Sequence, residues 1–186
     1  METYYDFERS ATTSDPRAHL PAMLLQPLDD EHKEYELRGD TGRVALIHMD
    51  DQRLNDRFEV EVDIGSEHYH QHADPDGSGK IHLDAEKNEV FSAEEQGVLR
   101  PTLCIDHRDH HYRLQCGLMS RKFVLTEESN QKLGTIAPES FFSSSYLVQL
   151  PESLPLLLRV FMTTLVLGET EELRAPLETM PYYFHG

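Results

Sequence analysis

The stretch that decides the fold is "SLPLLLRVFMTTLVLG", residues 153–168. It opens with a serine cap and a proline in the first turn and closes at Gly168, which are start and stop signals of a helix. The segment is apolar nearly all round, interrupted by Arg159, Thr163 and Thr164. Such a helix is either buried on all sides or in a membrane. Its length of roughly 20 Å is short of the roughly 30 Å hydrocarbon core, and Arg159 lies inside it, so burial within the protein is favoured.

The residues before this helix alternate as β-strands do. "RFEVEVDI" (57–64) alternates apolar with acidic residues, which predicts one buried face and one wet face. "YELRGDTGRVALIHMD" (35–50) and "RKFVLTEESNQKLGTIA" (121–137) each hold two apolar runs around turn residues, the pattern of a hairpin. Many short strands at roughly ten-residue spacing indicate an antiparallel sandwich or barrel. An apolar helix after such strands favours a mainly β fold, a closed antiparallel barrel around a central hydrophobic C-terminal helix.

"DPDGSGKIHLDAE", residues 74–86, fits both the loop of a calcium-binding EF-hand and the turn of a hairpin. Asp74 and Asp76 stand where an EF-hand loop has its first ligands, and a glycine occupies the sixth position. The twelfth position, which should be a bidentate Glu, is Ala85, and Glu86 falls one residue late. Alternating residues flank the segment where an EF-hand needs helices. We therefore predict a hairpin turn, with a weak cation site on its carboxylates as the alternative.

Composition limits the classes of partner. The 186 residues include 34 acidic and 17 basic ones, for a formal net charge of −17, which repels nucleic acid and anionic membranes. Cys104 and Cys116 form neither a CxxC pair nor a disulfide framework, and no N-terminal signal peptide is recognisable, so we expect a cytoplasmic protein. We expect residues 1–25 to be a polar, partly disordered lead-in and residues 26–186 to be one barrel domain.

The region 121–168 resembles the C-terminal half of the phospholipid scramblase and LURP-one-related group, in the tubby C-terminal-like superfamily. The matching features are a strand ending in a turn, "KLGTI", a Phe-Phe pair, a Tyr-containing strand ending in Leu-Pro, and the apolar helix. The resemblance is loose over residues 35–120 and absent before them. It implies a twelve-stranded antiparallel barrel wrapped around a central C-terminal helix, in agreement with the pattern of strands and helix.

The resemblance implies little about function. Tubby domains bind phosphoinositides through basic residues, whereas this chain is acidic and "FFSSSYLVQL" has no basic cluster beside it. Scramblases are described as calcium-dependent, with an acidic segment near the membrane helix. Here "GETEELRAP" follows the helix, and it is acidic but lacks the spacing of a calcium loop. No site residue and no cofactor is therefore carried over from the resemblance.

"HYHQH" places His68, His70 and His72 on one face of a strand, because side chains on a strand repeat every two residues. Two such imidazoles can bind zinc if a neighbouring strand supplies a third ligand. The candidates for that third ligand are His82, His107, His110 and His111. A polar outer face that carries several histidines explains the same pattern, and we favour that interpretation.

Motifs of catalysis are missing from the sequence, which has no GxSxG, P-loop, GxGxxG or HExxH. We therefore predict a non-enzymatic binding or scaffold module of the scramblase and LURP-one-related type, without a cofactor. Its expected partner is a lipid, a hydrophobic ligand or another protein, with no nucleic acid and no integral membrane span. The alternatives are a metal-binding protein built on the His-rich strand and a membrane-associated, scramblase-like protein.

Overall fold

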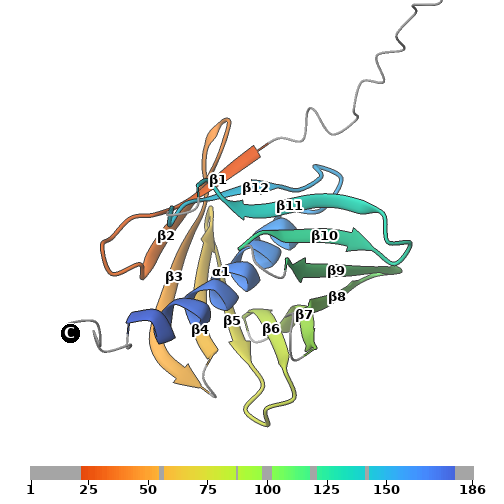
Figure 1. Cartoon of the computed structure of the whole chain (residues 1–186), viewed down its shortest axis with the longest axis horizontal. Helices are drawn as coiled ribbons and strands as arrows, with labels where there is room; N and C mark the ends of the chain where they lie inside the picture. The colour runs from red at the N-terminus through yellow and green to blue at the C-terminus, as the bar shows by residue number, and fades with distance from the viewer. Residues whose placement is uncertain are drawn as a thin grey trace, which may run out of the picture.

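The structure is a computed structural model, which describes residues 22–54, 57–86, 88–97, 102–117, 121–140 and 143–178. These residues form twelve strands and one helix (Figure 1). The strands are β1 (Ala22–Pro27), β2 (Glu34–Gly39), β3 (Gly42–Leu54), β4 (Arg57–Ile64), β5 (Glu67–Ala73), β6 (Lys80–Ala85), β7 (Asn88–Gln96), β8 (Thr102–His107), β9 (His110–Cys116), β10 (Phe123–Glu127), β11 (Lys132–Pro138) and β12 (Tyr146–Gln149). The helix is α1 (Leu156–Glu178).

The strands form a closed antiparallel barrel. Each strand pairs with its neighbours in the chain, and β1 pairs with β12 to close the ring. Figure 1 shows α1 running through the middle of this ring. The predicted fold class, a mainly β closed barrel with a C-terminal helix, is confirmed. Strand β1 includes residues 22–25 of the expected lead-in, and residues 1–21 lie outside the described part of the chain.

Alternation along the strands explains why each residue faces as it does. On β4, Val60 and Val62 are buried and face the helix, while Glu61 and Asp63 between and after them are exposed. On β9, Tyr112 and Leu114 are buried in the same way. Closure of the ring removes edge strands, whose unpaired backbone groups would otherwise invite aggregation.

Helix α1 is buried on all sides through its middle. The residues from Val160 to Leu167 are at most 1% exposed, which no helix lying on a surface would allow. Their two polar members are satisfied: Thr163 donates its hydroxyl to the carbonyl of Arg159, and Thr164 donates to the side-chain oxygen of Gln71 on β5 at 2.5 Å. Arg159 is partly exposed. The prediction of burial within the protein is confirmed.

The helix has different ends from those predicted. It begins at Leu156, after the serine cap expected at 153, and continues through Gly168 to Glu178. A glycine stop needs a left-handed residue at that position, whereas Gly168 stays helical. An internal glycine costs only about 1 kcal/mol, and the Glu and Leu residues that follow are good helix formers.

The glycine of "KLGTI" has a steric role. A Cβ atom at Gly134 would lie 2.3 Å from the carbonyl oxygen of Gln149 on β12, far inside van der Waals contact. Gly134 therefore allows β11 and β12 to approach each other closely. This requirement comes from a neighbouring strand, because Gly134 is not among the glycines with positive φ.

Replacing Phe161 with alanine tests the role of the central helix. Phe161 is fully buried and its ring stacks on Phe91 of β7 with centroids 5.9 Å apart, so the F161A variant should lose about 3–5 kcal/mol of unfolding free energy. Urea denaturation measures this loss. The control is Leu156→Ala, at a side chain that is 39% exposed, which should change stability by no more than about 0.5 kcal/mol. Equal losses in the two variants would contradict burial of α1.

Candidate functional site

The interior of the barrel is occupied by the helix. Inward residues of the strands, such as Leu83 and Leu103, form one continuous core with residues of α1 such as Leu165. All three are at most 1% exposed. A candidate binding site therefore has to be sought on the outer face of the barrel.

A first row of outward side chains crosses six neighbouring strands, β2 to β7. In cross-strand register its members are Glu34, His48, Glu61, His70, Asp84 and Glu89. Carboxylates and imidazoles alternate from Glu34 to Asp84. Side chains that face each other across antiparallel strands interact directly, so each imidazole in this row lies between two acids.

A second row runs beside the first, from β5 to β9. Its members are His72, His82, Ser92, Asp106 and His111. The ring of His72 stacks on that of His82, with centroids 5.6 Å apart, and on that of His70 at 5.3 Å. We call the two rows together the acid–imidazole wall.

Histidines on the outer face are matched with carboxylates. Among the described residues eight pairs lie within 4 Å, namely His48–Glu34, His68–Asp63, His70–Glu59, His72–Asp84, His82–Asp74, His82–Glu89, His110–Glu127 and His111–Asp106. The tightest are His111 with Asp106 at 2.5 Å and His82 with Glu89 at 2.7 Å. The surface charge of this face therefore depends on pH wherever these imidazoles titrate.

Two histidines of the wall, His82 and His111, have pKa values above the usual value for a histidine. Burial acts to lower the pKa of His82, but its hydrogen bonds to Glu89 and Asp74 and their negative charges outweigh burial and raise that pKa. The hydrogen bond that His111 donates to the Asp106 carboxylate, together with the charge of that carboxylate, raises the pKa of His111. His107, by contrast, has a pKa that burial lowers. Its ring packs edge-on against that of Phe91, with the two ring centroids 5.2 Å apart.

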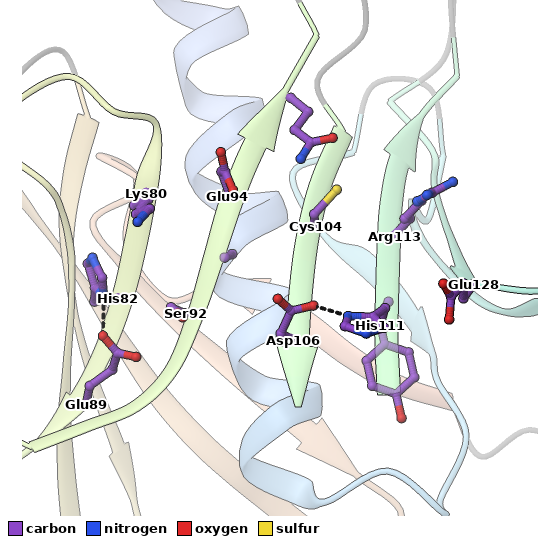
Figure 2. A pocket seen from close by; sticks show the side chains of 13 residues that line it. Lys80, His82, Glu89, Ser92, Glu94, Cys104, Asp106, His111, Arg113 and Glu128 are labelled. Carbon is purple, nitrogen blue, oxygen red and sulfur yellow. Dashed lines mark hydrogen bonds and ion pairs between the residues drawn. The ribbon is translucent and has the colours of Figure 1, made fainter. Parts of the chain in front are cut away.

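A groove of about 520 Å³ lies on the outer face over β6 to β9. Figure 2 shows short side chains, Ser92 and Cys104, between longer ones on either side. Its lining includes four carboxylates and two permanent cations, namely Glu89, Glu94, Asp106, Glu128, Lys80 and Arg113. The hollow follows from residue size, because two small side chains stand where neighbouring positions carry long charged ones. His82 and His111 of the wall line the groove as well.

The thiol of Cys104 is poorly suited to act as a nucleophile. Burial raises its pKa and outweighs the opposite effect of the Arg113 charge, so the thiol stays protonated at neutral pH. No described hydrogen bond joins Cys104 to an imidazole that would remove its proton. The groove thus offers charged groups and hydrogen-bonding groups for binding.

The predicted metal ligands share a face, as expected, but they do not converge. His68 contacts Asp63, while His70 and His72 stack on each other. His82 is paired with His72 across the hairpin, whereas His110 and His111 contact acids of other strands. Within the described part of the chain, no group of three or more His, Cys, Asp or Glu side chains is arranged to hold a metal ion. Metal binding at His68, His70 and His72 stays the less favoured alternative to a polar outer face.

The segment 74–86 is a hairpin, as predicted: β5 and β6 pair antiparallel on either side of the turn. The turn carboxylates support the turn itself. Asp76 accepts a hydrogen bond from the backbone N–H of Ser78, which lowers the pKa of Asp76, and Asp74 accepts one from the Ser78 hydroxyl. The carboxylates thus have a structural role that accounts for the EF-hand-like composition.

The groove was not predicted from the sequence. Its members belong to strands β6 to β9, with Glu128 from the turn after β10, and their proximity depends on cross-strand register, for example Cys104 opposite both Glu94 and Arg113. A usable signal is present, since Ser92 and Cys104 are small residues at outward positions of strands with charged neighbours. The register needed to combine them is not visible in sequence.

Comparisons with protein families, with curated proteins and with solved structures gave no match. The relation to the scramblase and LURP-one-related group therefore rests on residues 121–168 and stays a prediction. Among the described residues, no helix has both the length and the apolar character needed to cross a membrane. Phe141 and Phe142, part of the resemblance, lie outside the described residues.

Replacing Glu89 with glutamine tests the His82 pair. The pKa of His82, followed by NMR, should fall in E89Q because a charged acceptor is lost. The raised folded-state pKa stabilises the fold fully below the unfolded value of about 6.5, and this contribution is lost as the pH rises through the folded-state pKa. E89Q should therefore destabilise the protein more at acidic than at alkaline pH. Glu94→Gln, on the same strand, should leave His82 unchanged, and an unchanged titration in E89Q would contradict the pairing.

The two cysteines should differ in their reaction with maleimide. Cys104 is partly exposed in the groove, whereas Cys116 is 8% exposed and faces the core. Burial raises both thiol pKa values, so both should react more slowly than free cysteine, and Cys104 should react about tenfold faster than Cys116. Peptide mass spectrometry after timed labelling measures the two rates. Equal rates would show that the groove does not expose Cys104.

Proposed function

We propose that this chain is a non-enzymatic binding module, a barrel of the scramblase and LURP-one-related type, that holds a positively charged segment of a partner protein against its acid–imidazole wall. The observation that carries the proposal is the first row of the wall. Across six strands it presents four carboxylates and two imidazoles and contains neither Lys nor Arg.

Electrostatics favours a cationic partner over other classes. The chain carries a formal net charge of −17, which attracts cations over long distances and speeds their association. The two rows of the wall carry carboxylates and neither Lys nor Arg, and complementary charge on a partner then gives specificity and a fast association rate.

The groove adds shape to this charge. A Lys or Arg side chain entering it would meet the carboxylates of Glu94 and Asp106 above the small Ser92 and Cys104. Lys80 and Arg113 at its sides would repel a partner whose cationic groups are in the wrong register. Attraction in the hollow combined with repulsion beside it is the usual basis of specific recognition.

Other chemistry supports binding over catalysis and over a lipid ligand. The groove thiol is held protonated by burial, so it lacks the activation that a nucleophile needs. The core of the barrel is filled by α1 side chains, so an apolar ligand would have to bind outside. The described groove is lined mainly by charged and polar side chains, which suit a charged segment better than a lipid.

Binding of a short, fluorescently labelled oligolysine peptide tests the proposal. Fluorescence anisotropy at low salt and slightly alkaline pH should show binding, with no binding of an oligoglutamate peptide of the same length. The double variant Glu61→Gln, Asp84→Asn removes two carboxylates from the first row and should weaken binding about tenfold, equivalent to about 1.4 kcal/mol. Lowering the pH should also weaken it, because His82 and His111, whose pKa values are raised, then become positive.

A control of equal net charge separates the wall from the general acidity of the chain. Glu139 and Glu152 are exposed carboxylates in loops away from the wall, and the double variant E139Q, E152Q changes the net charge by the same amount. It should bind oligolysine as the wild type does. Equal weakening in the two double variants, or preference for oligoglutamate, would refute the proposal.

A further inference from the structure

The outer face also carries a row without charge. It crosses seven neighbouring strands from β7 through β12 to β1, and we call it the charge-free belt. Its members in cross-strand register are Gln96, Thr102, Gln115, Val124, Thr135, Gln149 and Ala22. Thr135 is nearly buried and the other members are partly or fully exposed.

Apolar side chains extend the belt on the side of β11, β12 and β1. Leu147 pairs with Leu24 on one side and with Ala137 on the other, and all three are half-buried outward residues. Because 27% of the chain is Asp, Glu, Lys or Arg, a row of seven neighbouring residues without a charge is unusual for it, and charged residues such as Glu94 and Arg113 flank this row. Scattered surface leucines need no explanation, but an uncharged row in register across seven strands does.

The polar members of the belt can both donate and accept hydrogen bonds. Gln115 uses its Nε2 to donate to the Thr102 hydroxyl, so its Oε1 is the group that can accept from another molecule. Gln149 uses its Oε1 to accept from Thr135, so its Nε2 is the group that can donate. A surface that offers both kinds of group can pair with a copy of itself across a two-fold axis.

We propose that the charge-free belt is the surface through which two copies of this chain associate. Two chains of net charge −17 repel each other when charged faces meet, and the belt lets them meet without opposing like charges. A cationic partner has nothing to pair with there, and an anionic membrane is repelled by the rest of the chain. A dimer formed this way leaves the first row of the acid–imidazole wall, on β2 to β7, open to partners, and it meets the groove at Gln96, which lines both surfaces.

Sedimentation velocity over a range of protein concentrations and salt tests the association. The wild type should form a dimer, and more of it as salt rises from about 0.01 M to about 0.1 M, because the screening length falls from about 30 Å to about 10 Å and the net repulsion with it. A wild type that stays monomeric at all concentrations and salts would overturn the proposal. Association that weakens as salt rises would overturn it as well, since opposite charges would then hold the copies together.

Isosteric charge insertion locates the surface. The double variant Gln115→Glu, Gln149→Glu keeps the acceptor for the Thr135 hydroxyl and replaces the amide donor to Thr102 with an acceptor toward which that hydroxyl can turn. It places like charges opposite each other in the dimer, so its dimer dissociation constant should rise at least about tenfold. The matched control is Asn88→Asp, Gln131→Glu, two exposed amides off the belt with the same change in net charge. The control should dimerise as the wild type does.

Two further measurements keep the result unambiguous. Circular dichroism and a thermal melt establish that each variant is folded, and the single variant Gln115→Glu, at an exposed position, serves if the double variant is not. Equal weakening by the belt variant and its control would overturn the assignment to the belt. So would a belt variant that dimerises as the wild type does. Binding of oligolysine by monomer and dimer alike would show that this surface is separate from the wall.

Discussion

The packing of α1 against the inner face of the barrel is the interaction on which the other features depend. A ring of twelve strands encloses more space than its own side chains would fill, and the residues from Val160 to Leu167 occupy that space. Burial of apolar area supplies the free energy that offsets the conformational entropy of a long, sequentially closed sheet. The hydrogen bond between Gln71 and Thr164 also joins β5 to α1 in the buried core, where an unpaired polar group would be costly.

Because the interior of the barrel is filled, a partner has to bind on the outer face. Each strand has one face committed to the core, and the alternate residues are free to vary in chemistry. This chain uses them in two ways. Over β2 to β9 the two rows of the wall present carboxylates and imidazoles, which alternate in register from β2 to β6, and from β7 to β1 a row of amides, hydroxyls and aliphatic groups carries no charge. Imidazoles between the carboxylates keep like charges apart in the first row of the wall, and the raised pKa values of His82 and His111 make the charge of the second row sensitive to pH.

Much of the fold could be predicted from local patterns, and the candidate site could not. Alternation in "RFEVEVDI" and the turn residues of 74–79 act within one hairpin, so β4, β5 and β6 were foreseen. The shared face of His68, His70 and His72 follows from strand periodicity, but whether they meet a metal or a carboxylate depends on the neighbouring strand. The prediction that the helix ends at Gly168 was wrong, because α1 continues to Glu178. One internal glycine destabilises a helix only slightly, and the residues after it include good helix formers.

The sequence by itself determined which residues face inward, where the turns fall, that an apolar helix must be enclosed, and that the surface is acidic. These properties are local, since they depend on period, turn chemistry and composition within a few residues. Only the tertiary structure decided which outward residues became neighbours: Glu34 with His48, Ser92 with Asp106, Gln115 with Val124. The physical reason is that cross-strand register and the β1–β12 closure are set by packing around α1 as a whole, and a shift of one residue would turn every such neighbour to the other face.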